Sequence, residues 1–376
     1  MNFQDAKQSV ALVLATGDVP LLVGNSGIGK TALAAGLAKD RDWELITIDA
    51  NLLKEGEIGG LPMVAQSGAV AVTSYAIHHT LKQAEELALS GRQVLLFIDE
   101  LNRCEHAVQQ ELMNIILNRQ INGFVLPAAV HVMAAMNPSG KYGDDYDYQV
   151  VEMDGAQENR FVWLFMETDA EQWCEWATAN ELEEAVIRFI ATYPAYLYQV
   201  KEGEIRATPR SYERVSKALA VYRQGGVPRH IFKEVVEGNI GKVLTEEFLG
   251  FLERDFRAFP TFEAVFSKEH LAAEIRERIV TEQQSGLLLL GQKLLTELEN
   301  RMRELIEDGE QERLSELQFL LERWLEVLEL YPLDLRLGIM KLMKQQTACL
   351  YPFALEQESF RNLYFSTYES AKGVTD

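Results

Sequence analysis

The chain has few cysteines, no long hydrophobic run and no excess of basic residues. Its three cysteines, Cys104, Cys174 and Cys349, lie far apart without metal-ligand spacing, so we expect free thiols in a reducing cytosol. The longest apolar runs, such as GLLLLG at residues 286–291, are far shorter than a membrane span, which excludes membrane insertion. The first ten residues, MNFQDAKQSV, contain no basic region leading into an apolar stretch. We therefore expect no signal peptide and a cytoplasmic location.

The shortage of basic residues also bears on the choice of partner. There are 36 basic against 57 acidic residues, which gives a net charge of -21. A surface of this charge repels phosphate backbones, so nucleic acid is not an expected partner. With 47% hydrophobic and 25% charged residues, the composition is typical of a soluble globular protein. A length of 376 residues suggests two or three domains.

The first 165 residues alternate between two kinds of pattern. Strand-like apolar runs occupy residues 19–24, 43–50, 93–100 and 129–138, and helical patterns occupy 31–40, 79–91 and 106–120. This alternation predicts a parallel sheet covered by helices. Residues 60–76 break the rhythm, because two strand-like runs flank the turn signal QSG, and we expect a β-hairpin there.

The chain after residue 166 is predicted to be helical. Apolar residues at spacings of three and four predict a helical hairpin, and they are Leu287, Leu290, Leu294, Leu298, Met302 and Leu305, then Leu314, Leu317, Leu321, Trp324 and Leu328. We expect three domains: a nucleotide-binding αβα core over 1–165, a helical lid over 166–240 and an acidic helical C-terminal region over 241–376.

A phosphate-binding loop follows the first strand. Its residues match G-x-x-x-x-G-K-[ST] between a strand and a helix, and they are Gly24, Asn25, Ser26, Gly27, Ile28, Gly29, Lys30 and Thr31, followed by Ala32. Glycines let successive backbone N–H groups turn toward phosphate oxygens, and the helix N-terminus adds positive charge. Lys30 is expected to reach the β- and γ-phosphates, and Thr31 to bind Mg²⁺.

Two adjacent acids end the third strand. Asp99 is placed to hold Mg²⁺ through its water shell, and Glu100 to polarise an attacking water. The alternative, a solvated strand end without a catalytic role, is disfavoured by the phosphate loop upstream.

Five segments resemble, in order and spacing, the MoxR-type AAA+ ATPases. They are LLFIDELNR (95–103), QQELMNIILNRQI (109–121), LPAAVHVMAAMNPSG (126–140), DGAQENRF (154–161) and ATPRSYERVSKAL (207–219). The resemblance covers roughly residues 1–240. It implies a P-loop NTPase fold of the AAA+ type, with a β-hairpin insert, an all-α lid and a helical extension. ATP and Mg²⁺ are the cofactors that it implies.

The resemblance also assigns roles by position. Gly24 to Thr31 correspond to Walker A, and Asp99 and Glu100 to Walker B. Asn137 corresponds to sensor 1, which helps to orient the attacking water, although an asparagine before Pro138 could also cap a turn.

Two arginines complete this assignment. Arg160 corresponds to an arginine finger that reaches the γ-phosphate of a neighbouring subunit. Arg210 corresponds to sensor 2, near the start of a lid helix for which Thr208 and Pro209 suit the cap and first turn. Arg103 also fits the family pattern, with no assigned partner. The alternative for Arg160 is a plain surface arginine, and for Arg210 an arginine on the helix face, with Arg206 and Arg214 as nearby competitors.

Expectations also attach to three further segments. The hairpin at 60–76 corresponds to an insert that lines the central pore and touches substrate in related rings, and a purely structural hairpin is the alternative. The acidic region 241–376 is either a docking module or a part of the lid core. The stretch 142–148 is expected to be an acidic loop.

The leading functional hypothesis is a homo-hexameric ring ATPase with a chaperone-like remodelling role. In systems of this type, a protein with a von Willebrand factor A domain commonly assists, and the ring helps metal or cofactor insertion or complex assembly. The main alternative is a nucleic-acid motor or loader, against which the acidic composition and the hairpin without Lys or Arg both speak. A non-catalytic nucleotide-binding scaffold is a third possibility, disfavoured by the presence of Glu100 and Asn137.

Overall fold

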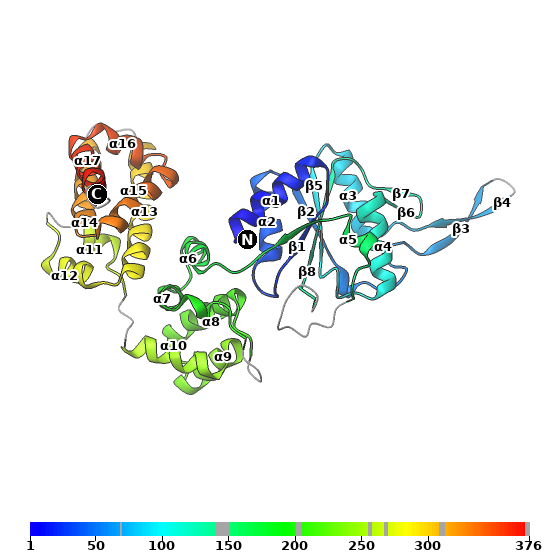
Figure 1. The fold of residues 1–376 in the computed structure, drawn as a ribbon, viewed down its shortest axis with the longest axis horizontal. Coiled ribbons are helices and arrows are strands. Elements are labelled where there is room, and N and C mark those ends of the chain that lie inside the picture. The colour runs from blue at the N-terminus through cyan, green and yellow to red at the C-terminus, as the bar shows by residue number, and fades with distance from the viewer. Residues whose placement is uncertain are drawn as a thin grey trace. The chain divides into compact units, whose positions relative to one another are not determined.

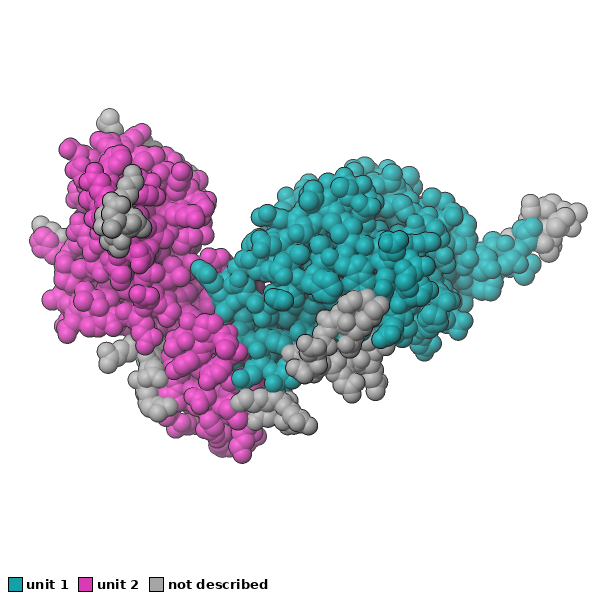
Figure 2. Space-filling view, viewed as in Figure 1, with its two compact units in different colours: residues 1–173, 197–214 teal, residues 174–196, 215–376 magenta. Residues whose placement is uncertain are grey.

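The computed structural model describes residues 1–67, 70–139, 151–200, 205–254, 258–266, 270–307 and 313–372. The acidic loop expected over 142–148 lies outside these residues. The chain forms two compact units, one made of residues 1–173 and 197–214 and the other of residues 174–196 and 215–376 (Figure 2). The division into three domains at residues 165 and 240 remains a prediction.

The centre of the first unit is a parallel five-stranded sheet. Its strands are β1 (Pro20–Val23), β2 (Glu44–Asp49), β5 (Val94–Asp99), β8 (Val130–Met136) and β9 (Val162–Phe165), in the order β2-β5-β8-β1-β9. The parallel sheet predicted from the sequence is confirmed, and β9 is an addition that the sequence did not indicate. Strand β5 is buried along its length until Asp99, which is half-exposed at its carboxyl end. Polar side chains at this end of the sheet can therefore meet solvent and ligands.

Helices cover both faces of this sheet (Figure 1). Helices α1 (Phe3–Thr16) and α2 (Lys30–Asp40) share one apolar core with Leu95 and Phe97 of β5. Helices α3 (His79–Leu89) and α4 (His106–Asn118) share a second core with Leu96 and Ile98 of the same strand. Alternate residues of β5 thus pack in opposite directions, as expected for a strand buried on both faces.

Two small hairpins interrupt the alternating pattern. Strands β3 (Pro62–Ser67) and β4 (Val70–Tyr75) pair antiparallel, with Pro62 opposite Tyr75, which confirms the hairpin predicted over 60–76. This hairpin extends away from the body of the first unit, beyond α4 (Figure 1). The two-residue strands β6 (Gln120–Ile121) and β7 (Phe124–Val125) follow α4 directly.

The remaining elements are helical; those after residue 166 confirm the helical pattern predicted there, whereas η1 and α5 were not predicted. They are η1 (Ala50–Leu52), α5 (Gly155–Glu158), α6 (Ala170–Ala179), α7 (Glu184–Thr192), η2 (Pro194–Tyr196), α8 (Pro209–Arg223), α9 (Arg229–Ile240), α10 (Lys242–Arg254), α11 (Phe262–Phe266), α12 (Ala273–Thr281), α13 (Gln284–Glu307), α14 (Arg313–Glu329), α15 (Leu333–Gln346), α16 (Leu350–Glu356) and α17 (Glu358–Lys372). Among the helices described, none is long and apolar enough to cross a membrane.

Helices α13 and α14 form the predicted helical hairpin. All six apolar residues predicted on the first helix, from Leu287 to Leu305, are buried. On the second helix, Leu317, Leu321 and Trp324 are buried, but Leu314 is 54% exposed, so its assignment to the apolar stripe was wrong. Leu314 lies in the first turn of α14, where helical spacing alone does not ensure that a partner element covers the side chain.

Candidate nucleotide-binding and hydrolysis site

The phosphate-binding loop lies where the sequence placed it. Strand β1 ends at Val23, residues 24–29 form the loop, and α2 begins at Lys30. Gly27 has a φ of 81°, and a Cβ on it would lie 2.8 Å from Thr208 Oγ1. A side chain at this position would therefore be strained and would collide with the residue that precedes α8.

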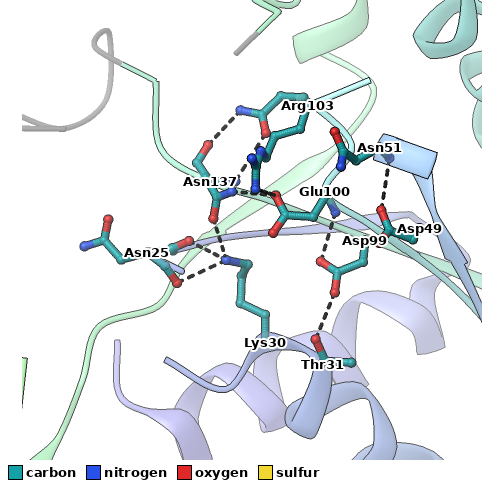
Figure 3. Close-up of polar contacts among 11 residues, drawn as sticks. Asn25, Lys30, Thr31, Asp49, Asn51, Asp99, Glu100, Arg103 and Asn137 are labelled. Carbon is teal, nitrogen blue, oxygen red and sulfur yellow. Dashed lines mark hydrogen bonds and ion pairs between the residues drawn. The ribbon is translucent and has the colours of Figure 1, made fainter. Parts of the chain in front are cut away.

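The Lys30 ammonium is enclosed by three oxygen acceptors (Figure 3). Nζ donates to the carbonyl of Gly24 at 2.6 Å, to the carbonyl of Asn25 at 3.1 Å and to Asn137 Oδ1 at 2.9 Å. Lys30 is only 6% exposed, although it carries a charge. Its contacts join the phosphate loop directly to the end of β8, where Asn137 lies.

Burial has a marked effect on this lysine. It lowers the pKa of Lys30 to about 8, and the positive charges of Arg210 and Arg103 act in the same direction. The Glu100 and Asp99 carboxylates oppose the change, because they favour the ammonium. A lysine with this pKa changes its charge close to neutral pH, where a phosphate ligand would strongly favour the charged form.

We expect the affinity for ATP to fall as the pH rises above about 8, the pKa of Lys30. Bound phosphates raise this pKa, so binding takes up a proton wherever the free amine is neutral. Affinity is then constant well below this pH and falls by up to about tenfold per pH unit above it. Titration of a fluorescent ATP analogue from about pH 7 to about pH 9.5 measures the slope. The Lys30→Arg variant stays charged throughout, and an equal slope in both proteins would contradict the prediction.

Asp99 and Thr31 form the second pair of the site. Thr31 Oγ1 donates to Asp99 Oδ2 at 2.8 Å, and the other oxygen of Asp99 accepts the backbone N–H of Glu100 at 2.9 Å. Within the described residues, no group of three His, Cys, Asp or Glu side chains gathers as a metal site. A hydroxyl and one carboxylate are a suitable donor set for Mg²⁺, which usually keeps several waters and takes the remaining oxygens from phosphates.

Glu100 is held at the carboxyl end of the sheet by Asn137. Asn137 Nδ2 donates to Glu100 Oε2 at 2.5 Å, while Oδ1 of the same amide accepts from Lys30. One amide thus connects the lysine and the carboxylate, with its orientation fixed by both partners. Glu100 has a φ of 54°, a left-handed conformation that is uncommon for a residue other than glycine. Strain of this kind often lies at functional sites.

The environment of Glu100 also changes its proton affinity. Partial burial raises the pKa of Glu100 and the Asp99 carboxylate adds to the rise, while the Lys30 charge opposes it. Arg103, left without a partner by the sequence, lies with Nη1 3.7 Å from Glu100 Oε2 and also favours the ionised form. A carboxylate with a raised pKa in this position can accept a proton from water.

Asn102 supports the site and was missed by the sequence analysis. Its side chain is buried, donates from Nδ2 to the Asn137 carbonyl at 2.8 Å, and accepts the Asn137 N–H at Oδ1 at 3.3 Å. This reciprocal pair fixes the backbone that carries the Asn137 amide. Asn102 stands between Leu101 and Arg103, and a polar residue just after a buried strand was the available signal.

Arg210 lies beside the phosphate loop. Its backbone N–H donates to the Gly27 carbonyl at 3.3 Å, and its charge acts on Lys30. Helix α8 begins at Pro209, and Thr208 Oγ1 accepts the Ser211 N–H at 3.2 Å, which confirms the predicted cap and first turn. The Arg210 side chain is exposed, so it is free to turn toward a ligand in the loop.

Arg160 is the predicted site residue that the structure does not bring into this group. It follows α5, whose N-terminus carries a capping box between Asp154 and Gln157, and its own backbone N–H donates to the Gln157 carbonyl at 3.2 Å. The side chain is exposed, and among the described residues its guanidinium has no hydrogen bond or ion pair. Arg160 is therefore an exposed cation without a polar partner among the described residues.

The site residues fit a nucleoside triphosphate with Mg²⁺. Asn25 Oδ1 is buried without a hydrogen-bond partner in the part of the chain described, an arrangement that is costly unless a ligand or water satisfies it. Lys30 supplies a positive charge, and Thr31 and Asp99 supply hard oxygen donors. Ser26, Ile28, Gly29 and Ala32 complete the predicted phosphate-binding segment across the loop and the first turn of α2.

Comparison with known protein families finds one match in this region. Residues 20–144 match the family described as "ATPase family associated with various cellular activities (AAA)". The match begins at β1 and includes the phosphate loop, both acidic residues and Asn137, and it supports ATP hydrolysis in general. None of the curated protein sequences compared matches this chain.

Several solved structures match part of this chain. RuvB of Thermotoga maritima, named as a Holliday junction branch migration motor, is 18% identical and is matched over 74% of either chain, with a TM-score of 0.36. A variant of the same RuvB is 18% identical over 70% of this chain and 81% of its own, with a TM-score of 0.38. A Cytophaga hutchinsonii protein named as a candidate ATPase is 18% identical over 66% and 92%, with a TM-score of 0.33. Sequence identities and TM-scores this low give no basis for transferring the activity of these proteins to this chain.

Proposed function

We propose that the protein is an ATP-hydrolysing ring ATPase of the MoxR type with a chaperone-like remodelling role. The observation that carries the proposal is the meeting of Lys30, Asp99, Glu100 and Asn137 at the carboxyl end of the sheet. These side chains come from three segments of the chain, and together they offer a phosphate-binding cation, a metal-binding acid and a hydrogen-bonded base. The resemblance of residues 1–240 to MoxR-type ATPases supports the subtype.

In this proposal each residue has a distinct role. The loop from Gly24 to Thr31 and the Lys30 ammonium hold the phosphates, and Thr31 and Asp99 hold Mg²⁺. Bound Mg²⁺ would neutralise charge on the phosphates. Glu100 accepts a proton from the attacking water, and Asn137 orients Glu100 through the bond from Nδ2. Arg210 adds positive charge from the side of α8.

Arg160 is the reason that the proposal includes a ring. It is an exposed cation without a partner in the described part of its own chain, so a neighbouring protomer is the natural source of its ligand. We propose a homo-hexamer in which the Arg160 of one protomer reaches the γ-phosphate held by the next. Such an arginine stabilises charge in the transition state of phosphoryl transfer.

The remodelling role is supported by the hairpin β3–β4. Residues 61–77 contain neither Lys nor Arg, while Leu61, Met63 and Val64 are 68%, 51% and 80% exposed. An uncharged, apolar and exposed hairpin suits polypeptide better than a phosphate backbone. We propose a cytoplasmic ring that acts with a protein carrying a von Willebrand factor A domain, in complex assembly or in metal or cofactor insertion.

The partner proposal is tested with a variant that binds ATP and hydrolyses it slowly. Glu100→Gln rings held with ATP and Mg²⁺ are expected to retain a von Willebrand factor A-type protein through affinity purification, as measured by mass spectrometry. The Lys30→Ala variant, which should bind no ATP, is the control and should retain much less. Retained nucleic acid, together with ATP hydrolysis stimulated by DNA at physiological salt, would instead establish a nucleic-acid motor.

A further inference from the structure

The base of the hairpin β3–β4 is closed by one glycine. Gly60 has a φ of 83°, and a Cβ on it would lie 1.9 Å from the Ala76 carbonyl oxygen. Just beyond it, the Ala76 N–H donates to the Leu61 carbonyl at 3.0 Å. Any side chain at residue 60 would force the two ends of the hairpin apart. The direction of the hairpin is thus set by the residues that hold the segment before Gly60.

Two side chains hold that segment from both sides. The Glu111 carboxylate on α4 accepts the Gly56 N–H at 2.9 Å through one oxygen and the Gly59 N–H at 3.3 Å through the other. Asn122, in the β6–β7 turn, donates from Nδ2 to the Gly59 carbonyl at 2.8 Å. We call Glu111 and Asn122, with the backbone that they bind at Gly56 and Gly59, the hairpin clamp. Bonds to a carboxylate are stronger than those between neutral groups.

The apolar core binds the same segment to α4. Ile58, between the two clamped glycines, is 1% exposed and lies in one core with Leu101, Val108 and Leu112. The clamp and this core together fix residues 56–60 to α4. A displacement of α4 therefore carries the base of the hairpin with it, because packed cores move as units rather than deform continuously.

The N-terminal end of α4 follows the hydrolysis site directly in the chain. The helix begins at His106, after the short segment that carries Glu100, Asn102 and Arg103. In that segment Asn102 is bonded to the backbone of Asn137, and Cys104 Sγ donates to the Leu101 carbonyl at 3.2 Å. The helix therefore connects the segment that carries the site residues to Glu111, which binds the backbone before the hairpin.

We propose that Glu111 and Asn122 are positioning residues that make the hairpin β3–β4 follow α4, and so transmit the nucleotide state of the site to the hairpin. This inference rests on the proposed function, in which the hairpin touches substrate. Among the described residues, the hydrogen bonds of the Glu111 and Asn122 side chains go to Gly56 and Gly59 and to no residue of the hydrolysis site. Their loss should uncouple the hairpin and leave nucleotide binding in place.

The test measures the direction of the hairpin itself. Spin labels are placed at Val64→Cys on the hairpin and at Leu12→Cys on α1, a helix that packs in the other core of the first unit; these residues are 80% and 68% exposed. The background carries Cys349→Ser, because Cys349 is only partly buried and could react with the label. Cys104 and Cys174 are buried and are kept. Labelled chains are diluted into unlabelled chains, so that each ring holds one pair. The distance between the labels is measured with ADP and with a non-hydrolysable ATP analogue.

With the clamp intact, the distance between the labels is expected to shift between the two nucleotides. The Glu111→Gln variant, which replaces one acceptor oxygen by a donor group, should lose the shift. Asn122→Gly should do the same, and glycine suits the left-handed backbone at residue 122, where φ is 44°. Glu105→Gln is the matched control, an exposed acid just before α4 whose side chain makes no cap bond, and it should keep the shift.

Two results would overturn the inference. One is an unchanged shift in the Glu111→Gln variant. The other is an equal label distance with ADP and with the ATP analogue in the chain with an intact clamp, when each nucleotide is shown to be bound. Binding and phosphate release are measured on the same samples. A chain that hydrolyses ATP without a shift overturns this inference alone, whereas a chain that shifts without hydrolysing ATP overturns the proposed function alone.

Discussion

Replacing Glu100 with glutamine is expected to lower the turnover number for ATP about 10²–10⁴-fold, the usual contribution of a general base. Glutamine keeps the shape of the side chain, and its carbonyl oxygen can still accept from Asn137 Nδ2, as Glu100 Oε2 does at 2.5 Å. The amide cannot take a proton from water, so the loss should fall on the chemical step. Phosphate release measures turnover, and titration of a fluorescent ATP analogue measures binding, which should change little.

The pH of this comparison matters because the charges of the site are coupled. The Glu100 carboxylate opposes the lowering of the Lys30 pKa, so its removal leaves the lysine less charged near that pKa of about 8. Measurement about one unit below this value separates the loss of the base from a loss of phosphate binding. Glu105→Gln serves as the control and should turn over normally. A Glu100→Gln protein with more than half of the normal turnover would exclude Glu100 as the base.

Arg160→Ala is expected to lower turnover about 10³–10⁵-fold, the range found for an arginine that contacts the transferred phosphoryl group. The structure places Arg160 on the surface of its own chain, so the same residue should act on the site of another chain. This makes a sharper prediction than the single substitution. Chains that are inactive alone should restore each other when mixed, provided that one carries Arg160→Ala and the other Glu100→Gln.

The expected recovery can be stated in advance. In a ring with head-to-tail contacts, each site takes Glu100 from one chain and Arg160 from its neighbour. Equal mixing of the two variants leaves both residues intact at about a quarter of the interfaces, so about a quarter of the normal turnover should return. Mixtures of Arg160→Ala with Lys30→Ala test the same geometry with a binding variant. Full activity of Arg160→Ala alone would rule out a shared site.

The sequence predicted the core of the fold because local patterns and tertiary packing agree there. Strand β5 reads as a continuous apolar run, and the structure buries it on both faces. Strands β6, β7 and β9 were not predicted. Strands β6 and β7 are only two residues long, too short to show an alternating pattern. Strand β9 is stabilised by pairing with β1, and contacts between such distant residues leave no periodic signal in either segment.

The site could be predicted to a similar extent, for a related reason. Lys30, Asp99 and Asn137 each stand at the end of a recognisable strand or the start of a helix, and parallel strands bring such ends to one edge of the sheet. Their roles remain predictions until the variants are measured. Asn102 and Glu111 could not be assigned, because an isolated polar residue on a loop or helix does not reveal which backbone it will bind.

The place of β1 in the sheet has a consequence for how the chain is made. Leu21 pairs with Ala134 of β8 on one side and with Trp163 of β9 on the other. The strand before the phosphate loop can therefore pair only after segments far along the chain have been synthesised. Closing such long loops is slow, which puts the loop among the last parts of the core to become ordered. A ligand that binds only the closed core stabilises it by RT ln(1 + [L]/Kd). In the proposed function that ligand is ATP, so the fraction of folded chains should rise with the ATP concentration.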